Sequence, residues 1–205
     1  MQVGGRTLLA HVVDAVEACA AVEAFVLTVP QDGEEDVASA ARSPKLASLV
    51  AGGRERQDSV AAGLAAIPAE FQVVVVHDVA RPFATPALYE AVIAALDEPV
   101  GGRTADGAVP LVPGPDTLKR VDDGIVLETL DRTKVLAAQT PQAFRREALE
   151  EAHRMAREQG FVATDDAALL ERAGFRVVAV VGEPLNFKVT RPEDLARAEA
   201  VTRRG

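Results

Sequence analysis

Near its centre the chain runs Val73-Val74-Val75-Val76-His77-Asp78-Val79-Ala80-Arg81-Pro82. Four consecutive valines are apolar on both faces, which is typical of a central strand in a parallel sheet that helices cover on both sides. Polar side chains follow at the carboxyl end of this run. Because open α/β sheets bind ligands outside the carboxyl ends of their strands, we expect a ligand site at His77 and Asp78.

Strand and helix patterns alternate on both sides of this segment. Apolar residues repeat with helical spacing from Leu8 to Val16, and a β-rich run follows from Phe25 to Val29. Further strands are expected at 46–50, 108–112 and 175–181, and further helices at 59–67, 85–96, 145–159, 164–172 and from 190 onward, with another starting at 32–35. The alternation predicts one α/β domain over residues 1–205, with a Rossmann-like, doubly wound, mostly parallel sheet.

Residues 114–133 break this alternation. Two β-like runs, at 116–121 and 125–130, flank Asp122-Asp123-Gly124, which suits a hairpin loop because glycine readily adopts positive φ. A lone hairpin is only marginally stable in water. We therefore expect this β-arm to pack on the body of the protein or on another subunit.

Composition narrows the classes of function. The formal net charge is −9, which argues against a general nucleic-acid binder, since phosphate backbones need a basic surface. No run is long and apolar enough to cross a bilayer, and Met1 to Arg6 lacks the pattern of a signal peptide. The single cysteine, Cys19, cannot form an internal disulfide. We expect a cytoplasmic protein with neither nucleic-acid nor membrane partners.

The segment after the valines carries the best-marked chemistry. Asp78 offers the carboxylate oxygens that Mg²⁺ prefers, and Arg81 has the guanidinium geometry that clamps a phosphate. An Asp78–Arg81 ion pair that fixes a loop before Pro82 explains the same residues equally well. The residues alone therefore leave a metal–phosphate site and a structural ion pair open.

A second segment, Gly52-Gly53-Arg54-Glu55-Arg56-Gln57-Asp58-Ser59, combines paired glycines with polar residues. Glycine lets backbone approach a ligand closely, and Asp58 or Ser59 can cap a following helix, whose N-terminus favours anions. An ordinary strand–loop–helix turn would have the same composition, so this motif is weak when taken alone. The same holds for Arg132, for Thr140-Pro141-Gln142 and for the segment from Asn186 to Thr190, where a lysine is more often solvated than functional.

The combination is far more specific than its parts. Together these segments resemble the 2-C-methyl-D-erythritol 4-phosphate cytidylyltransferase family, whose folds are of the nucleotide-diphospho-sugar transferase type. The matching blocks keep the family's order and spacing from about Arg6 to the C-terminus, and they read GGRERQDSVAAGL, VVVHDVARP, DTLK, LDRTKVLAAQTPQAF, TDDAALLERAG and NFKVTRPEDLARAE.

The resemblance implies a nucleotidyltransferase that uses Mg²⁺ to transfer CMP from CTP to methylerythritol phosphate, releasing pyrophosphate, in non-mevalonate isoprenoid biosynthesis. By motif, Gly53, Arg54 and Ser59 would lie against the cytosine, and Asp78 would bind Mg²⁺. The sugar phosphate or the α-phosphate would be surrounded by Arg81, Thr140, Thr164 and Lys188. No general base is assigned, because the acceptor phosphate is already anionic, and His77 is expected to be structural.

The resemblance also implies a homodimer. In the family the hairpin is a dimerisation arm, and it would bring Arg132 into the substrate site of the neighbouring subunit. The residues expected to act directly on the reaction are Lys188, Arg132 and Arg81.

Two features depart from the family pattern. The family begins with a strand and a Gly-rich loop that wraps the triphosphate, whereas residues 4–9 resemble the start of the helix that follows this loop. Val79 stands where the family usually has alanine, and its bulk would crowd the nucleotide. We expect the natural protein to start upstream; the alternatives are a catalytically impaired homologue that acts as a binding or dimerising subunit, and a cytidylyltransferase for another polyol phosphate such as ribitol 5-phosphate.

Overall fold

The computed structural model describes residues 1–30, 37 and 41–203, so the helix expected to start at 32–35 lies outside the described residues. The helices are α1 (Leu8–Ala18), α3 (Arg56–Ala66), α4 (Pro86–Ala94), α5 (Arg146–Gln159), α6 (Asp166–Arg172) and α7 (Pro192–Thr202). The strands are β1 (Gln2–Val3), β2 (Arg6–Thr7), β3 (Phe25–Val29), β4 (Leu46–Ala51), β5 (Val73–Val76), β6 (Gly107–Pro113), β7 (Lys119–Asp122), β8 (Ile125–Thr129), β9 (Leu136–Ala138), β10 (Gln142–Arg145) and β11 (Val177–Val181). Within this part of the chain, no helix has the length and hydropathy of a membrane span.

The main sheet has the strand order β11-β6-β10-β5, and β9 adds to β6. Strand β11 runs parallel to β6, while β10 runs antiparallel to both of its neighbours, β6 and β5. Strands β5, β6 and β11 therefore share one direction, as the expected doubly wound fold requires. Only β9 and β10 run antiparallel to these three strands. Neither β9 nor β10 was predicted, because their sequences, LAA and QAFR, are too short to show a clear strand pattern.

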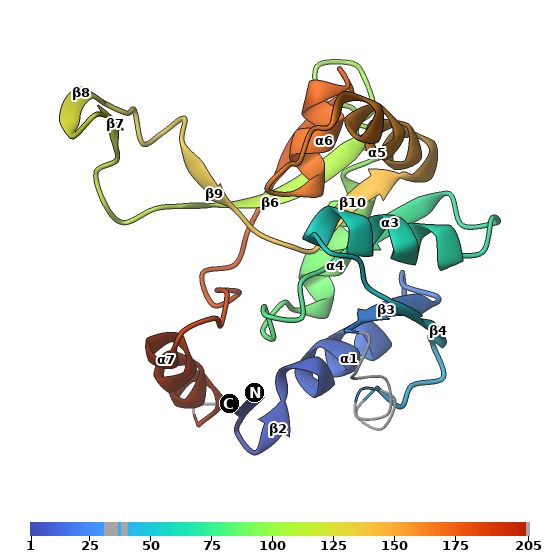
Figure 1. Ribbon diagram of the computed structural model, residues 1–205. Coiled ribbons are helices and arrows are strands. Elements are labelled where there is room, and N and C mark those ends of the chain that lie inside the picture. The colour runs from blue at the N-terminus through green and yellow to red at the C-terminus, as the bar shows by residue number, and fades with distance from the viewer. Residues whose placement is uncertain (31–36, 38–40, 204–205) are drawn as a thin grey trace.

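Helices cover both faces of this sheet (Figure 1). Successive side chains of a strand point to opposite faces. Phe144 of β10 is fully buried on one face among Leu149 of α5 and Leu170 of α6. Ala143, its neighbour in β10, packs on the other face near Val92 of α4. This two-sided burial confirms the α/β class expected from the alternating pattern.

The valine strand differs from expectation in one respect. We expected β5 to be a central strand, but it forms the edge of the main sheet, and β3 and β4 form a separate parallel pair. A cavity of about 820 Å³ lies between β3 and β5 and is also lined by Val12 and Val16 of α1. Because no described strand fills this space, Val75 and Val76 are only partly buried.

The first residues form a small antiparallel ribbon outside both sheets. Strands β1 and β2 pair with each other, and Gly4 and Gly5 make the turn with φ of 59° and 74°. Val3 is fully buried in a small cluster with Val189 and Ala198, so the two ends of the chain pack together. The Gly4-Gly5 segment thus forms a tight turn that leads into α1.

The β-arm projects from the body of the molecule (Figure 1). Strands β7 and β8 pair antiparallel, as expected, and all of their residues are exposed. Asp123 and Gly124 make the turn with positive φ. The exposed side chains include Val121, Ile125 and Val126. Within one chain the arm therefore does not pack on the body, and its apolar residues face outward.

Candidate active site

Asp78 lies at the carboxyl end of β5, and its carboxylate is bracketed by two cations. Its Oδ1 accepts a hydrogen bond of 3.1 Å from Nε of Arg56, and its Oδ2 accepts one of 2.8 Å from Nζ of Lys188. Burial raises the pKa of Asp78, but the hydrogen bond from Lys188 and the charge of Arg56 outweigh burial and hold it below its usual value. The sequence allowed an Asp78–Arg81 ion pair; the structure instead pairs Asp78 with Arg56 and Lys188.

Arg56 was assigned no role by the sequence. It is the first residue of α3, which begins before Ser59 because Glu55 and Asp58 form a reciprocal capping box. Arg56 also donates from Nη1 to Oδ2 of Asp166, at 2.7 Å. The only signal in the sequence was its place in the glycine-containing block, three residues before Ser59, and that signal did not distinguish it from Arg54.

Thr140 and His77 hold the backbone beneath Asp78. The Thr140 hydroxyl accepts a hydrogen bond of 3.0 Å from the Asp78 amide and lies 3.2 Å from Nδ1 of His77. Nε2 of His77 lies 3.1 Å from the Arg81 carbonyl, which can only accept, so Nε2 carries the proton and Nδ1 accepts from Thr140. Removal of the ring from water lowers the pKa of His77 to about 4, which makes it a neutral structural imidazole near pH 7.

Arg81 binds backbone carbonyls. Its Nη1 donates to the carbonyl of Asn186 at 2.9 Å and its Nη2 donates to that of Ala138 at 3.1 Å. Among the described residues its buried Nε has no partner, and burial lowers its pKa. Arg81 therefore joins the end of β9 to the segment that carries Lys188.

Buried amides fix the loop before Lys188. Asn186 is fully buried and donates from Nδ2 to the Thr140 carbonyl at 2.8 Å. Gln139, 4% exposed, donates to the carbonyl of Glu183 at 2.8 Å and accepts from the Glu183 amide at 3.0 Å. This loop is thus tied to the segment beside β10, so Lys188 is held against Asp78 by a rigid frame.

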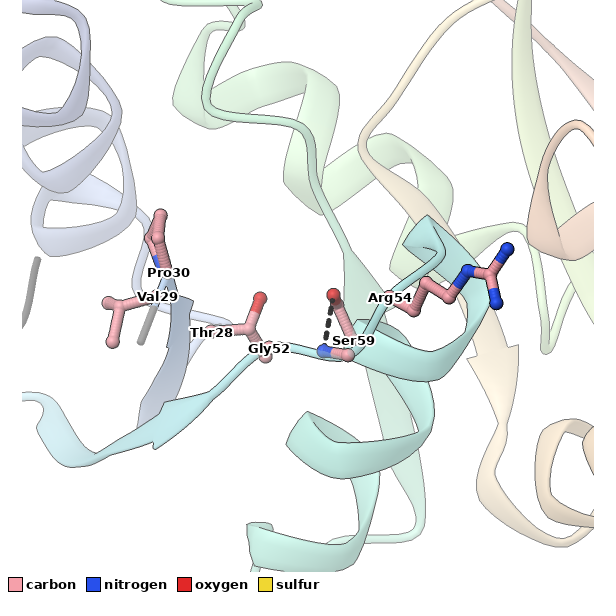
Figure 2. A pocket seen from close by; sticks show the side chains of 7 residues that line it. Thr28, Val29, Pro30, Gly52, Arg54 and Ser59 are labelled. Atoms are coloured by element: carbon pink, nitrogen blue, oxygen red, sulfur yellow. Dashed lines mark hydrogen bonds between the residues drawn. The ribbon is translucent and has the colours of Figure 1, made fainter. Parts of the chain in front are cut away.

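The glycine segment lines a separate pocket (Figure 2). The Gly53 amide donates to the Ser59 hydroxyl at 3.0 Å, and a Cβ at Gly53 would lie 2.2 Å from Cβ of Asp58. Arg54 extends away from Thr28, and its side chain is 93% exposed. The pocket has a volume of about 660 Å³ and is lined by Thr28, Val29, Pro30, Gly52, Gly53, Arg54 and Ser59. Gly53, Arg54 and Ser59, which the family resemblance assigns to the cytosine, thus line one pocket.

Two expected residues lie apart from the Asp78 cluster. Arg132 is exposed in the turn after β8, and no hydrogen bond or ion pair of the described residues joins it to this cluster. Thr164 is exposed immediately before Asp165, whose side chain caps α6. Thr164 is thus two positions before Asp166, the residue that holds Arg56.

The donor set fits a magnesium ion that also binds phosphate. The Asp78 carboxylate is 19% exposed and lies at a sheet edge among cations that suit phosphate. The described residues contain no group of three His, Cys, Asp or Glu side chains that could form an all-protein cage. Mg²⁺ usually takes one or two carboxylates and completes its shell with water and substrate phosphate oxygens, so a lone carboxylate is sufficient.

The fold and the site define an α/β protein with a candidate phosphate site at the end of a strand. A two-sided α/β sheet presents a carboxylate and two cations at the carboxyl end of one strand, beside a glycine-lined pocket. Residues 1–204 match the family model of IspD, described as 2-C-methyl-D-erythritol 4-phosphate cytidylyltransferase, and the chain belongs to this family.

Individual relatives agree with the family assignment. The chain is 44% identical to the 2-C-methyl-D-erythritol 4-phosphate cytidylyltransferase of Pelotomaculum thermopropionicum, over 98% of this chain and 84% of that one. The crystal structure of 4-diphosphocytidyl-2C-methyl-D-erythritol synthase from Anaerococcus prevotii matches with a TM-score of 0.91 and 29% identity, covering 99% of this chain and 92% of that one. The Thermus thermophilus cytidylyltransferase matches with a TM-score of 0.80 and 36% identity, covering 98% and 91%.

Some relatives are much longer. The bifunctional IspD/IspF enzyme of Nitratidesulfovibrio vulgaris is 52% identical over 74% of this chain, and that match spans 37% of the relative's length. The bifunctional IspD/IspF enzyme of Anaeromyxobacter dehalogenans is 45% identical over 97% of this chain and 50% of its own length, so the chain spans about half of such relatives.

Proposed function

We propose that this protein transfers CMP from CTP to the phosphate of 2-C-methyl-D-erythritol 4-phosphate and releases pyrophosphate. The observation that carries the proposal is the Arg56–Asp78–Lys188 cluster at the end of β5, in a chain of the IspD family. An oxygen of the acceptor phosphate attacks the α-phosphorus of CTP as the bond to the bridging oxygen of pyrophosphate breaks. No proton needs to be removed, which agrees with a neutral structural His77.

The base of CTP is assigned to the glycine-lined pocket. Its volume of about 660 Å³ is in the range typical of small-molecule sites. Gly53 adds no side chain of its own to the pocket wall, and its amide donates to the Ser59 hydroxyl. Arg54, which is highly exposed, is free to turn toward the nucleotide. This pocket and the Asp78 cluster are linked by α3, whose first turn carries both Arg56 and Ser59.

The phosphates are assigned to the cations beside Asp78. Both reactants are anionic, so the protein must align them and offset their repulsion. Lys188 is 45% exposed and lies at the open side of the carboxylate, where it can reach a phosphate. Arg81 supports that loop and contributes positive charge, and the Thr140 hydroxyl binds the Asp78 amide. Thr164 is assigned to the phosphates by the family resemblance.

Asp78 is the residue that would hold Mg²⁺. When bound, the ion would neutralise phosphate charge during the in-line displacement. Oδ2 of Asp78 accepts a hydrogen bond from Lys188, so a bound ion would share the carboxylate with Lys188 or replace it there. In either arrangement the ammonium of Lys188 would lie close to the phosphates that the ion binds.

The β-arm is proposed to join two subunits. Its exposed apolar residues would be covered in a dimer, and an uncovered hairpin is marginally stable. Arg132, at the base of the same arm, would then reach the partner's substrate site. We place the activity in the cytoplasm, which suits a chain whose single cysteine is free and buried.

The test is direct measurement of turnover. The purified chain is incubated with CTP, Mg²⁺ and methylerythritol phosphate, and pyrophosphate is measured alongside the cytidylylated product. A parallel reaction with ribitol 5-phosphate examines the acceptor. Turnover with methylerythritol phosphate supports the proposal. Faster turnover with ribitol 5-phosphate would show that ribitol 5-phosphate is the acceptor. No turnover with either compound would favour a catalytically impaired homologue that acts as a binding or dimerising subunit.

A further inference from the structure

Four side chains from separate elements connect the interior to Asp78. His153 of α5 lies with Nε2 3.1 Å from Oδ1 of Asp166, and Oδ2 of Asp166 accepts from Nη1 of Arg56 at 2.7 Å. Nε of Arg56 then reaches Oδ1 of Asp78 at 3.1 Å. The chain of contacts thus runs from helix α5 through α6 and α3 to the end of β5.

The inner end of this chain is buried. The side chains of Asp166 and His153 are 1% and 5% exposed, whereas that of Arg56 is 32% exposed. A buried carboxylate is costly unless charged and hydrogen-bonding partners satisfy it, so Asp166 strongly constrains both of its partners. The charges of Asp166 and Asp78 overcome the effect of burial and raise the pKa of Arg56. The guanidinium is therefore held between one buried and one partly exposed carboxylate.

The contacts of Arg56 with two carboxylates depend on the planar guanidinium group of arginine. Different nitrogens of the planar guanidinium contact the two carboxylates, so the position of Asp166 sets the position of Asp78. With Oδ1 tied to Arg56, Oδ2 faces Lys188 and the open side of the site. A lysine at position 56 has a single ammonium on a flexible stem and would not impose this relation.

We propose that Asp166, held by His153, is a positioning residue that fixes the Asp78 carboxylate through Arg56. Neither Asp166 nor His153 touches substrate in this arrangement. Their effect is on the direction of Asp78, and hence on the binding of metal-bound nucleotide. Only the effect on nucleotide binding rests on the proposed function. The chain of contacts from His153 through Asp166 and Arg56 to Asp78, here called the tether, is a property of the protein without ligands.

The proposal is tested with Asp166→Asn, which keeps the side-chain shape but removes the charge that holds Arg56. Glu150→Gln is the matched control, since it makes the same change at a carboxylate that is 49% exposed and paired with Arg146. The first readout is the ¹⁵N–¹H NMR signal of Arg56 Nε in the ligand-free protein. The second is the dissociation constant of the Mn²⁺–CTP complex, measured by water proton relaxation.

We expect Asp166→Asn to shift the Arg56 Nε signal and to weaken Mn²⁺–CTP binding by roughly tenfold to a hundredfold, the usual cost of losing a partner that orients a metal ligand. Glu150→Gln should match the wild type in both. His153→Leu should weaken binding, whereas His153→Gln, which keeps an N–H donor, should restore most of it. A folded Asp166→Asn protein with an unchanged signal and unchanged affinity overturns the proposal.

Folding failure does not end the test. Where Asp166→Asn does not fold, Arg56→Lys replaces it, because Arg56 is only partly buried; unchanged Mn²⁺–CTP affinity in that variant overturns the proposal. A failure of the proposed function can be told apart from a failure of the tether. A wild type without pyrophosphate release, whose Arg56 signal still depends on Asp166, refutes the activity and leaves the tether in place.

Discussion

Nζ of Lys188 lies 2.8 Å from Oδ2 of Asp78, although the two residues are 110 positions apart in the chain. Asp78 lies two residues after the end of β5, and Lys188 lies in the segment between β11 and α7. Arg56 occupies the other oxygen of the same carboxylate at 3.1 Å. Both oxygens of the Asp78 carboxylate therefore have a cationic partner before any substrate arrives, and an incoming metal ion competes with these two cations.

Replacing Lys188 tests the phosphate assignment. Lys188→Ala should lower kcat by about 10²- to 10³-fold, because a positioned cation that stabilises transition-state charge contributes on this scale. Steady-state kinetics with both substrates measure the effect. Arg154→Ala removes a cation from the exposed face of α5 and should leave kcat unchanged. Equal kinetics for Lys188→Ala and the wild type would remove Lys188 from the reaction.

Replacing Asp78 tests the metal assignment. Asp78→Asn keeps the shape of the side chain but loses its charge, so metal-dependent turnover should be abolished while the circular dichroism spectrum stays that of the folded protein. Titration of Mg²⁺ over a wide range gives the measurement. A variant that reaches wild-type turnover at wild-type Mg²⁺ concentrations would place the ion elsewhere.

Mixing variants tests the shared site. Arg132→Ala and Lys188→Ala should each impair activity alone. If Arg132 acts across a dimer, a heterodimer of the two has one intact site and one doubly altered site, and activity should return to about half. Differently tagged subunits allow the heterodimer to be purified and assayed. No recovery in verified heterodimers would mean that each subunit uses its own Arg132 or none.

Gly53 gives a test of the nucleotide pocket. Gly53→Ala would place a methyl group 2.2 Å from Cβ of Asp58, so the loop or the capping residue must move. Displacements of about 1 Å can cost up to about 10²-fold in rate, and we expect kcat/KM for CTP to fall by about tenfold or more. Arg154→Ala, on the exposed face of α5, is the control. Similar kinetics for both variants would contradict the assignment of this loop to CTP.

The lowered pKa of the buried His77 side chain predicts that the free energy of unfolding depends on pH. Its pKa is about 4 in the folded protein and 6.5 in its ordinary state, so between these values the unfolded chain binds a proton that the folded chain does not. Stability therefore falls as the pH falls from 6.5 toward 4, by at most about 1.4 kcal/mol for each pH unit. Urea unfolding at several pH values measures the slope.

His77→Gln supplies the comparison, because glutamine keeps an N–H donor for the Arg81 carbonyl but does not titrate. The wild type should lose more stability than this variant between pH 6.5 and pH 4. Parallel pH profiles would show that His77 takes up its proton equally in both states.

Local sequence patterns were enough to predict several elements and some short-range contacts. The hairpin of the β-arm follows from Asp123 and Gly124, whose positive φ closes the turn. Thr85 and Pro86 begin α4 as expected, since the Thr85 hydroxyl accepts from the Leu88 amide. Gly53 and Ser59 meet because both belong to one short loop and the helix that follows it. Such features depend on neighbouring residues, which the sequence lists directly.

Contacts between distant segments required the folded chain. A run of valines shows that β5 is apolar, but not that it lies at an edge, because strand order depends on which segments pair. The sequence did not distinguish Arg56 from Arg54. The packing of α3 and α6 places Arg56 between Asp78 and Asp166. The hydroxyl of Thr140 likewise binds the Asp78 amide across 62 positions. The sequence thus pointed to Asp78 and Lys188 but not to Arg56. The packing of helices on the sheet decided which groups touch, since hydrogen bonds form only over a few ångströms and only packing brings remote residues that close.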